Sequence, residues 1–198
     1  MKIYDCIQGS DEWWAVKLGK VSASNFSEVL NKKTGRGLCM RKLAAERLTG
    51  TYEKSYYNKN MEMGNELEEE ARKYYEKENN CTVVQVGFVA RDEWVGVSPD
   101  GLVGESGNLE IKCVIPSTHI HTILKNELPD AHVPQVQGQL WVTERLWCDF
   151  VSYSPLMKGR PFHCIRVPRD DNYITSILEK EVRIFVEQLK DMISQIAF

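Results

Sequence analysis

Stretches with helical and with strand spacing of apolar residues alternate along this chain in an order that few folds accommodate. Helix patterns come first, strand patterns follow at 82–89, 93–97 and 108–114, and two helices, two strands and a long closing helix complete the chain. No internal repeat and no long linker divides the 198 residues, so one core and a single domain over residues 1–198 are expected. The order predicts an α/β fold with a mixed β-sheet flanked by helices.

Capping and turn residues set the expected boundaries of these segments. Ser10 followed by two acids predicts a helix start and Gly19 its end, and a second start is expected at Ser22 or Ser24. The turn between the first two strands is expected at Arg91-Asp92. The remaining predicted segments are helices at 38–48, 61–78, 117–126, 134–143 and from 170 or 171 onward, and strands at 147–154 and 162–167.

Charge is distributed unevenly along the chain. Residues 1–60 hold 11 basic and 6 acidic side chains, whereas residues 61–110 hold 4 and 12. The simpler interpretation is two solvated surfaces of opposite sign, and the alternative is a basic surface that meets phosphates beside an acidic one that requires cations. Because no apolar run reaches the roughly 18 residues of a membrane span or forms a signal peptide, a cytoplasmic protein without membrane contact is expected.

The spacing of cysteines and histidines gives no basis for a zinc or iron–sulfur site. The six cysteines are scattered, without a Cys-x-x-Cys pair. We expect reduced thiols that pack mostly as small hydrophobic residues. His119 and His121 would diverge on a helix, so with Asp130 and His132 they are interpreted as ordinary polar residues.

The segment that carries chemistry is Ser98-Pro99-Asp100-Gly101, followed after a Gly-rich turn by Glu110-Ile111-Lys112. Residues two apart on a strand share a face, so Glu110 and Lys112 should point together and Ile111 into the core. If the strand that ends before Asp100 pairs with the strand at 108–114, the two carboxylates converge and favour a divalent cation. The alternative is an ordinary cross-strand ion pair at the surface.

In their order and surroundings these residues resemble a known family. Asp100 followed by Glu110-x-Lys112 matches the PD-(D/E)XK nuclease motif, and the chain is similar to the lambda-type exonucleases, or YqaJ-like viral recombinases, from Gln8 to the last helix. This resemblance implies a restriction-endonuclease-like core. The pieces that match are Gln8-Gly9-Ser10 with Trp13, Leu18-Gly19 with Ser22-Ala23-Ser24, Met63-Gly64 leading to Glu68 and Ala71-Arg72, Ser98-Pro99-Asp100-Gly101-Leu102, Leu109-Glu110-Ile111-Lys112-Cys113, and Gln135-Val136-Gln137 before Leu140-Trp141-Val142-Thr143.

The resemblance also implies a metal site. Asp100 and Glu110 would be metal ligands, helped by the main-chain carbonyl of Ile111. The ion would be Mg²⁺, which keeps several waters when bound. Mn²⁺ is expected to substitute for it, whereas Ca²⁺ is expected to permit DNA binding without efficient cleavage.

Three further side chains receive roles from the same resemblance. Lys112 would hold and polarise the attacking water, Glu68 would bind a metal-bound water or a second ion from the long helix, and Gln135 would orient the nucleophile. The alternative for Glu68 is simple solvation, and for Gln135 an ordinary exposed helix amide.

Degradation from a 5′ end, which the resemblance implies, requires a pocket for a terminal phosphate. Lys17, Ser24 and Ser98 match the positions of that pocket, and Arg36 is a candidate to supplement it. The family usually has Arg where Lys17 stands, and Lys supplies a point charge in place of a bidentate fork. One of Trp13 and Trp14 is expected in the core, because both cannot face inward equally on a helix.

Taken together, the resemblance implies a Mg²⁺-dependent exonuclease that removes 5′ nucleotides from double-stranded DNA ends. It would release mononucleotides and leave 3′ single strands for recombination by strand annealing. A homotrimeric ring, with the basic segment 1–60 lining its channel, and a single-strand annealing protein as partner are implied as well. The alternatives are an endonuclease of the same superfamily and a non-catalytic DNA-binding module on the same fold.

Overall fold

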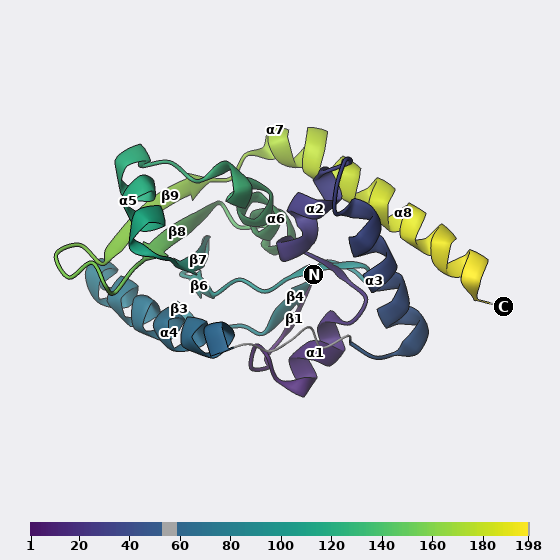
Figure 1. Ribbon diagram of the computed structural model, residues 1–198, viewed down its shortest axis with the longest axis horizontal. Coiled ribbons are helices and arrows are strands. Elements are labelled where there is room, and N and C mark those ends of the chain that lie inside the picture. Colours follow the sequence, from purple (N-terminus) through teal and green to yellow (C-terminus); the bar gives the residue numbers. More distant parts are fainter. Residues whose placement is uncertain (53–58, 198) are drawn as a thin grey trace.

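Two β-sheets and the helices around them make up the structure, a computed structural model that describes residues 1–52 and 59–197, with side chains at 1–52 and 67–197 (Figure 1). The first sheet has the order β1-β4-β5-β2, and the second the order β3-β6-β7-β8-β9. Both are mixed, because β2–β5 and β7–β8 pair in parallel and the other pairs are antiparallel. The strands are β1 (Lys2–Tyr4), β2 (Val21–Ser22), β3 (Val83–Val84), β4 (Phe88–Ala90), β5 (Val95–Val97), β6 (Gly101–Val103), β7 (Gly107–Cys113), β8 (Trp147–Tyr153) and β9 (Phe162–Pro168).

The predicted α/β class is confirmed, but the prediction of one sheet is wrong. The strand expected at 82–89 is divided into β3, which pairs with β6, and β4, which pairs with β1 and β5. Between them the chain passes Gly87, where a Cβ would lie 2.2 Å from the main-chain oxygen of Cys6. This close approach requires glycine, and it lets the chain cross from one sheet to the other.

The helices follow the capping signals closely. Ser10 caps α1 (Asp11–Lys17) through the main-chain N–H of Trp13 at 3.3 Å, and Gly50, with a positive φ of 66°, ends α3 (Arg36–Thr49). The expected start at Ser22 opens a 3₁₀ turn that leads into α2 (Phe26–Leu30). The other helices are α4 (Lys59–Asn79), α5 (Pro116–Lys125), α6 (Val133–Thr143), α7 (Asp171–Tyr173) and, after a π-helical turn at Ile174–Leu178, α8 (Glu179–Ile196).

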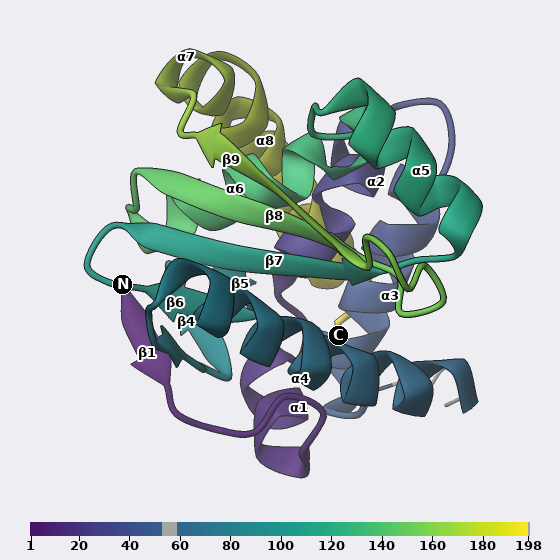
Figure 2. The same cartoon turned by 90° about the vertical axis from the view of Figure 1, so that its left-hand side faces the viewer.

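The second sheet is covered on both faces, and this arrangement decides which side chains of β7 meet. Figure 2 shows α4 across β6 and β7, with α6 behind β8. On the α4 side, Tyr75 packs with Leu109 and Ile111, whereas on the α6 side Val136 and Leu140 pack in a separate cluster with β8 residues. Alternate residues of β7 therefore face two different layers, and Ile111 points into the core as predicted.

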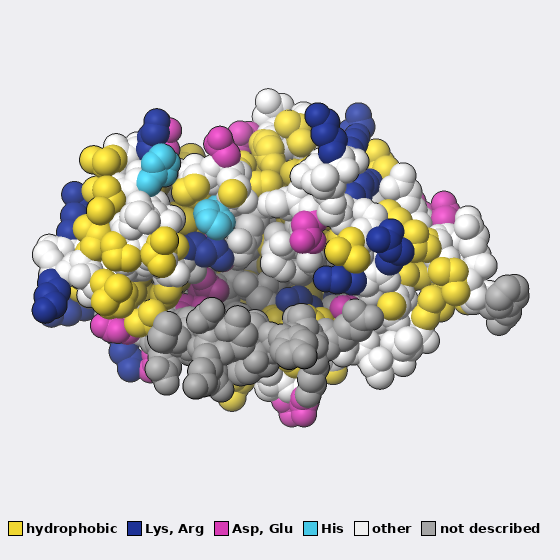
Figure 3. Space-filling model, in the orientation of Figure 1, with side chains coloured by type: hydrophobic (Ala, Val, Ile, Leu, Met, Phe, Trp, Pro, Cys, Tyr) yellow, Lys and Arg dark blue, Asp and Glu magenta, His cyan; other side chains and the backbone are white. Residues whose placement is uncertain are grey.

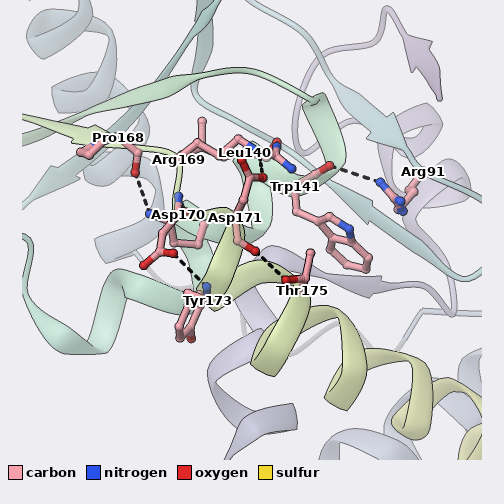
Figure 4. A network of polar contacts seen from close by, with 10 residues as sticks. Arg91, Leu140, Trp141, Pro168, Arg169, Asp170, Asp171, Tyr173 and Thr175 are labelled. Carbon is pink, nitrogen blue, oxygen red and sulfur yellow. Dashed lines mark hydrogen bonds and ion pairs between the residues drawn. The ribbon is translucent and has the colours of Figure 1, made fainter.

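Two arginines donate hydrogen bonds to main-chain oxygens at the C-terminal end of α6 (Figure 4). Arg91 donates to the main-chain oxygen of Trp141 at 3.2 Å, and Arg169 donates to that of Leu140. Gln137 adds a link to the segment after β9, since it donates to the Pro168 oxygen at 3.0 Å and accepts from the Asp170 N–H at 2.9 Å. The two arginines thus satisfy the carbonyls of Leu140 and Trp141, which the helix itself leaves unpaired. The opposite face of α6 packs against β7.

All six cysteines are free thiols, and Cys39 and Cys148 are buried. His119 is fully buried, with its ring nitrogens 2.7 Å from the Ser152 hydroxyl and 3.0 Å from the Arg160 oxygen, which fits the interpretation of an ordinary polar residue. No helix within the described ranges is long and apolar enough to span a membrane.

Candidate active site

Asp100 and Glu110 meet across a pair of strands, although not the pair that the sequence suggested. Asp100 does not end a strand that pairs with β7; it immediately precedes β6, which pairs antiparallel with β7 in a register that sets Gly101 against Leu109. The N–H of Asp100 donates to the Leu109 oxygen at 3.1 Å, and the N–H of Ile111 donates to Asp100 Oδ2 at 2.6 Å. This register extends to place Asp100 opposite Glu110.

The carboxylate of Glu110 is buried, and each of its two oxygens is contacted by at least one donor. Glu110 is 1% exposed, and its Oε1 lies 2.5 Å from Lys112 Nζ and accepts from Gln135 Nε2 at 2.5 Å. Its Oε2 accepts from Gln139 Nε2, also at 2.5 Å. The alternative of a surface ion pair is therefore wrong for Glu110, and Gln135 is not an ordinary exposed amide.

Negative charge is in excess where Asp100, Glu110 and Glu68 face one another. Burial raises the pKa of Asp100 well above its usual range, the charges of Glu110 and Glu68 raise it further, and Lys112 opposes them. Burial works against the charge of Lys112, but Glu110 and Asp100 together raise its pKa above the ordinary lysine value. Lys112 thus stays protonated, and the site still favours an additional cation.

Glu68 faces this site from α4 and is tied to Arg72. Arg72 Nη2 donates to Glu68 Oε1 at 2.8 Å, and Arg72 Nε donates to the main-chain oxygen of Asp100 at 3.3 Å. Burial raises the pKa of Glu68, Arg72 opposes this shift, and Glu110 adds to it. Glu68 is thus more than a solvated acid, since its charge acts on Asp100, Glu110 and Lys112.

The donor set fits a hard divalent cation with a small number of protein ligands. Within the described ranges no three Asp, Glu, His or Cys side chains gather closely enough to ligate one ion. Asp100 and Glu110 supply two carboxylates, and oxygen ligands of this kind suit Mg²⁺, which is commonly held by one or two carboxylates and several waters. The additional ligand predicted at the Ile111 carbonyl, and the water-mediated role predicted for Glu68, remain predictions.

A cavity of about 550 Å³ opens beside Asp100 and extends to the N-terminal segment. Glu68, Arg72 and Gln85 line it together with Asp100. Gln8 lines the cavity too, and it fixes the N-terminal segment, because its Nε2 donates to the Val86 oxygen at 3.1 Å and to the Pro99 oxygen at 2.9 Å.

On the face shown in Figure 3, hydrophobic side chains gather over α5, and charged side chains of both signs lie in the recessed middle.

Lys17 and Ser24 come together, as the phosphate-pocket prediction requires. Both line a cavity of about 190 Å³, which Lys20, Lys42 and Cys39 also border. Lys17 Nζ lies 4.3 Å from the centre of the Trp13 ring, and burial lowers the pKa of Lys17 to about 8. The hydroxyls of Ser22 and Ser24 are 2.9 Å apart. The cavity thus combines three amines and a hydroxyl, which suit an anion, with the carboxylates of Glu28 and Glu46 on the same wall.

Ser98 contacts Trp13, whose ring lies against Lys17. Its hydroxyl accepts from Trp13 Nε1 at 2.9 Å, and the same N–H also reaches the Gly87 oxygen at 2.9 Å. Trp13 is buried and Trp14 only partly so, which confirms that one of the two belongs to the core. Ser98 is not among the described residues that border the cavity, so it is linked to Lys17 through Trp13.

The structure does not bring Arg36 to the pocket. As the first residue of α3, Arg36 turns toward α8, where it donates to Gln188 Oε1 at 3.1 Å and lies 5.2 Å from the Phe185 ring. It also donates to the main-chain oxygen of Val29. The expectation that Arg36 supplements Lys17 is therefore wrong: the guanidinium already joins α2 and α3 to α8.

Comparison with known proteins agrees with this geometry. Residues 12–146, more than half of the chain, match the YqaJ-like viral recombinase domain. The chain belongs to this family. A crystal structure of an alkaline exonuclease, LHK-Exo from Laribacter hongkongensis, is 40% identical and covers 94% of this chain and 96% of its own, with a TM-score of 0.88; its complex with dAMP gives 0.89. The YqaJ-like chain thus has the PD-(D/E)XK exonuclease fold, a mixed α/β core flanked by helices.

More distant similarities support the fold over most of the chain. A phage related exonuclease from Haemophilus somnus 129PT aligns with 18% identity and a TM-score of 0.71 over 90% of this chain and 96% of its own. A curated protein of Escherichia coli (strain K12), ExoD, described as uncharacterized, is 30% identical over 71 residues, which are 36% of this chain and 80% of that protein.

In this YqaJ-like chain, sequence reasoning overlooked two residues that contact the acidic cluster. Gln139 lies one helical turn after Gln135 and reaches the other oxygen of Glu110. Arg72 bridges Glu68 and the main chain of Asp100. The spacing of four between the two glutamines was a usable signal, because such residues share a helix face. The spacing of four between Glu68 and Arg72 was another.

Proposed function

We propose that the protein is a Mg²⁺-dependent exonuclease that degrades double-stranded DNA from its 5′ ends. It would release mononucleotides and leave 3′ single strands for homologous recombination by strand annealing. The observation that carries the proposal is the cluster of Asp100, Lys112 and the buried Glu110, whose carboxylate is held by two glutamines of α6. Family membership and the 40% identity to an alkaline exonuclease support it.

The chain's own residues suit hydrolysis of a phosphodiester. Asp100, Glu110 and the Ile111 carbonyl would hold a Mg²⁺ ion, which when bound supplies a more acidic water and neutralises charge on the phosphate. Lys112 holds its proton at Nζ, because the neighbouring carboxylates favour the charged form. It would therefore act as a hydrogen-bond donor that orients the attacking water.

Polarity would be set by the cavity that holds Lys17 and Ser24. A 5′-terminal phosphate offers two negative charges and several acceptor oxygens, which match an amine and a hydroxyl at one wall. Lys20 and Lys42 border the same cavity and would offset the carboxylates of Glu28 and Glu46, which also line it. A 3′-hydroxyl end offers no such charge, so the cavity would bind only the strand that ends in a 5′ phosphate.

The wider assembly is proposed from the family resemblance. A homotrimeric ring would enclose the duplex, so that a chain of net charge −3 could retain DNA by topology as well as by charge. A single-strand annealing protein would receive the 3′ strand. Light scattering of the purified protein should give the mass of three chains, and a monomer at assay concentration would contradict the ring.

The deciding experiment uses linear duplex DNA with a label at either the 5′ or the 3′ end, together with closed circular DNA. With Mg²⁺ the 5′ label should be released first, as a mononucleotide, and the circle should stay intact. Cleavage of the circle would indicate an endonuclease, and earlier loss of the 3′ label would reverse the proposed polarity. With Ca²⁺ in place of Mg²⁺, DNA should be bound and not cleaved.

A further inference from the structure

Two ion pairs with the same spacing lie one residue apart on α4, but they differ in burial. Glu69 and Lys73 are 2.6 Å apart, and their side chains are 61% and 71% exposed. This is an ordinary surface pair, which contributes little. Glu68 and Arg72 are 2.8 Å apart, and the Arg72 side chain is only 10% exposed. Because a guanidinium withdrawn this far from water loses hydration, the helical spacing alone does not account for its position.

Arg72 is anchored to segments outside α4 by two neutral acceptors. Its Nε donates to the main-chain oxygen of Asp100, which precedes β6, at 3.3 Å. Gln85 lies between β3 and β4, and its amide oxygen, when turned toward the guanidinium, accepts from Nη1 at 2.7 Å and from Nη2 at 3.2 Å. The planar fork of an arginine makes these contacts and the contact with Glu68 at once, whereas the compact ammonium of a lysine does not span them.

The position of the Glu68 carboxylate depends on this guanidinium. Arg72 Nη2 donates to Glu68 Oε1, and no other hydrogen bond or ion pair joins the Glu68 side chain to residues 1–52 or 67–197. Glu68 is still 31% exposed and borders the cavity of about 550 Å³ together with Asp100. One carboxylate oxygen is thus held, and the other accepts no hydrogen bond from the described residues.

We propose that Arg72 is a positioning residue of the metal site, which holds one oxygen of Glu68 so that the other can bind a metal-bound water. This inference rests on the proposed metal site and on the role predicted for Glu68. The alternative is a purely structural role, in which Arg72 only joins α4 to the sheet. Groups that orient the ligands of a metal typically change metal affinity or activity by about 10- to 100-fold when they are replaced.

Arg145 provides a matched control in the same sheet. Its Nη1 donates to the main-chain oxygens of Gly104 at 2.9 Å and Gly107 at 2.7 Å, at the end of β6 opposite Asp100. Among the described residues it forms no hydrogen bond or ion pair with an acid. Arg145→Lys should therefore lower the melting temperature through lost hydrogen bonds without changing metal binding.

The test is calorimetric titration with Mn²⁺, as the probe for Mg²⁺, of the parent protein, Arg72→Lys and Arg145→Lys. Arg72→Lys keeps the charge, so its expected loss of about tenfold in Mn²⁺ affinity measures position and not electrostatic attraction. The Mn²⁺ concentration that gives half-maximal single-turnover cleavage should rise by the same factor. Arg145→Lys should keep the parental affinity.

The same titrations in a Glu68→Gln background show whether Arg72 acts through Glu68. There, Arg72→Lys should change Mn²⁺ affinity by less than about twofold, because no carboxylate is left to position. Thermal unfolding shows which variants are folded. If Arg72→Lys does not fold, Gln85→Met, a change at an exposed residue that removes one anchor, should give a smaller fall in the same direction.

Parental Mn²⁺ affinity in a folded Arg72→Lys would overturn the inference, as would an equal fall with and without the Glu68 carboxylate. An equal fall in Arg145→Lys would also overturn it, because loosening the sheet would then suffice. The proposed function fails separately. If the parent binds no Mn²⁺ and cleaves no DNA, the metal site itself is misassigned and the inference falls with it, whereas an active parent with unchanged Arg72→Lys refutes the inference alone.

Discussion

The acidic cluster around Glu110 and the cavity around Lys17 differ in how their charges are compensated. Lys112 forms an ion pair with Glu110 at 2.5 Å, and two amides complete the carboxylate's contacts. Lys17 instead contacts the Trp13 ring, and none of the ion pairs between described residues includes it. Burial raises the pKa of Lys112's neighbour Asp100 but lowers that of Lys17 to about 8.

This difference separates a site whose side chains are already arranged from one that requires a ligand. The cluster stands on β7 and α6, and α6 is held at its far end by Arg91 and Arg169. The cavity is bordered by the end of α1, by a 3₁₀ turn and by α3, and a bound anion would favour the charged form of Lys17. Chemistry and end recognition should therefore respond differently to mutation and to pH.

The largest effect is expected at Asp100. Asp100→Asn should lower the rate of hydrolysis by about a thousandfold or more, because one carboxylate ligand is lost. The same change should raise the melting temperature of the metal-free protein, since burial and Glu110 raise the pKa of Asp100 and its charge therefore costs stability above the usual carboxyl range. Parent protein, but not the variant, should regain that stability as the pH falls. Calorimetric melting without metal measures this, and a lower melting temperature would contradict it.

Loss of Lys112 should slow the chemical step without emptying the site. Lys112→Ala is expected to lower kcat by about 10²- to 10³-fold, because a preorganised donor is lost, and to change Mn²⁺ affinity only a little. Single-turnover assays and titration calorimetry measure the two quantities separately. If metal affinity fell as far as activity, Lys112 would be needed to build the site and not for the reaction.

A smaller effect is expected at the cavity. Lys17→Ala should lower the preference for 5′-phosphorylated over 5′-hydroxyl ends by about 10- to 100-fold, which corresponds to one charged hydrogen bond. The rate on 5′-hydroxyl ends should stay near that of the parent. Lys180→Ala, an exposed lysine on α8, serves as the control. Equal rates of the parent protein on both kinds of end would rule out the pocket.

The smallest effect concerns pH. The pKa of Lys17 is lowered to about 8, so its charge is present below that pH and lost above it. The preference for phosphorylated ends should therefore decline by up to about tenfold between pH 7 and pH 9. Lys17→Arg should abolish this decline, because a guanidinium stays charged over that range. Competition assays with both kinds of end across this range test the prediction, which a flat profile of the parent would contradict.

The sequence predicted most of the helices and the meeting of Asp100 with Glu110, but it gave a wrong reason for that meeting. Helix ends carry local signals such as Ser10 and Gly50, whose effects depend on a few neighbouring residues. Strand β6, with only three residues, lacks the alternation that would identify it, so Asp100 was assigned to the end of the preceding strand. The division of the chain between two sheets depends on contacts such as that of Gly87 with Cys6, which no local pattern reveals.

Buried polar residues were the hardest part of the site to predict. Gln135, Gln137 and Gln139 are equally polar in the sequence, yet the first and third face Glu110 and the second faces Pro168. Periodicity assigns such residues to solvent, and only the position of β7 against α6 decides otherwise. The prediction that Arg36 supplements the phosphate pocket was wrong for the same reason, because its contacts Gln188 and Phe185 are distant in sequence.

Each of the two sites has a cysteine at its margin. Burial, with a contribution from Glu68, raises the pKa of Cys113 to about 11, and burial with Glu28 raises that of Cys39 to about 12. Only a deprotonated sulfur attacks alkylating reagents or binds soft metals. Even in alkaline buffer, then, iodoacetamide should modify both thiols slowly, and a soft metal ion would have to displace a firmly held proton to bind either sulfur.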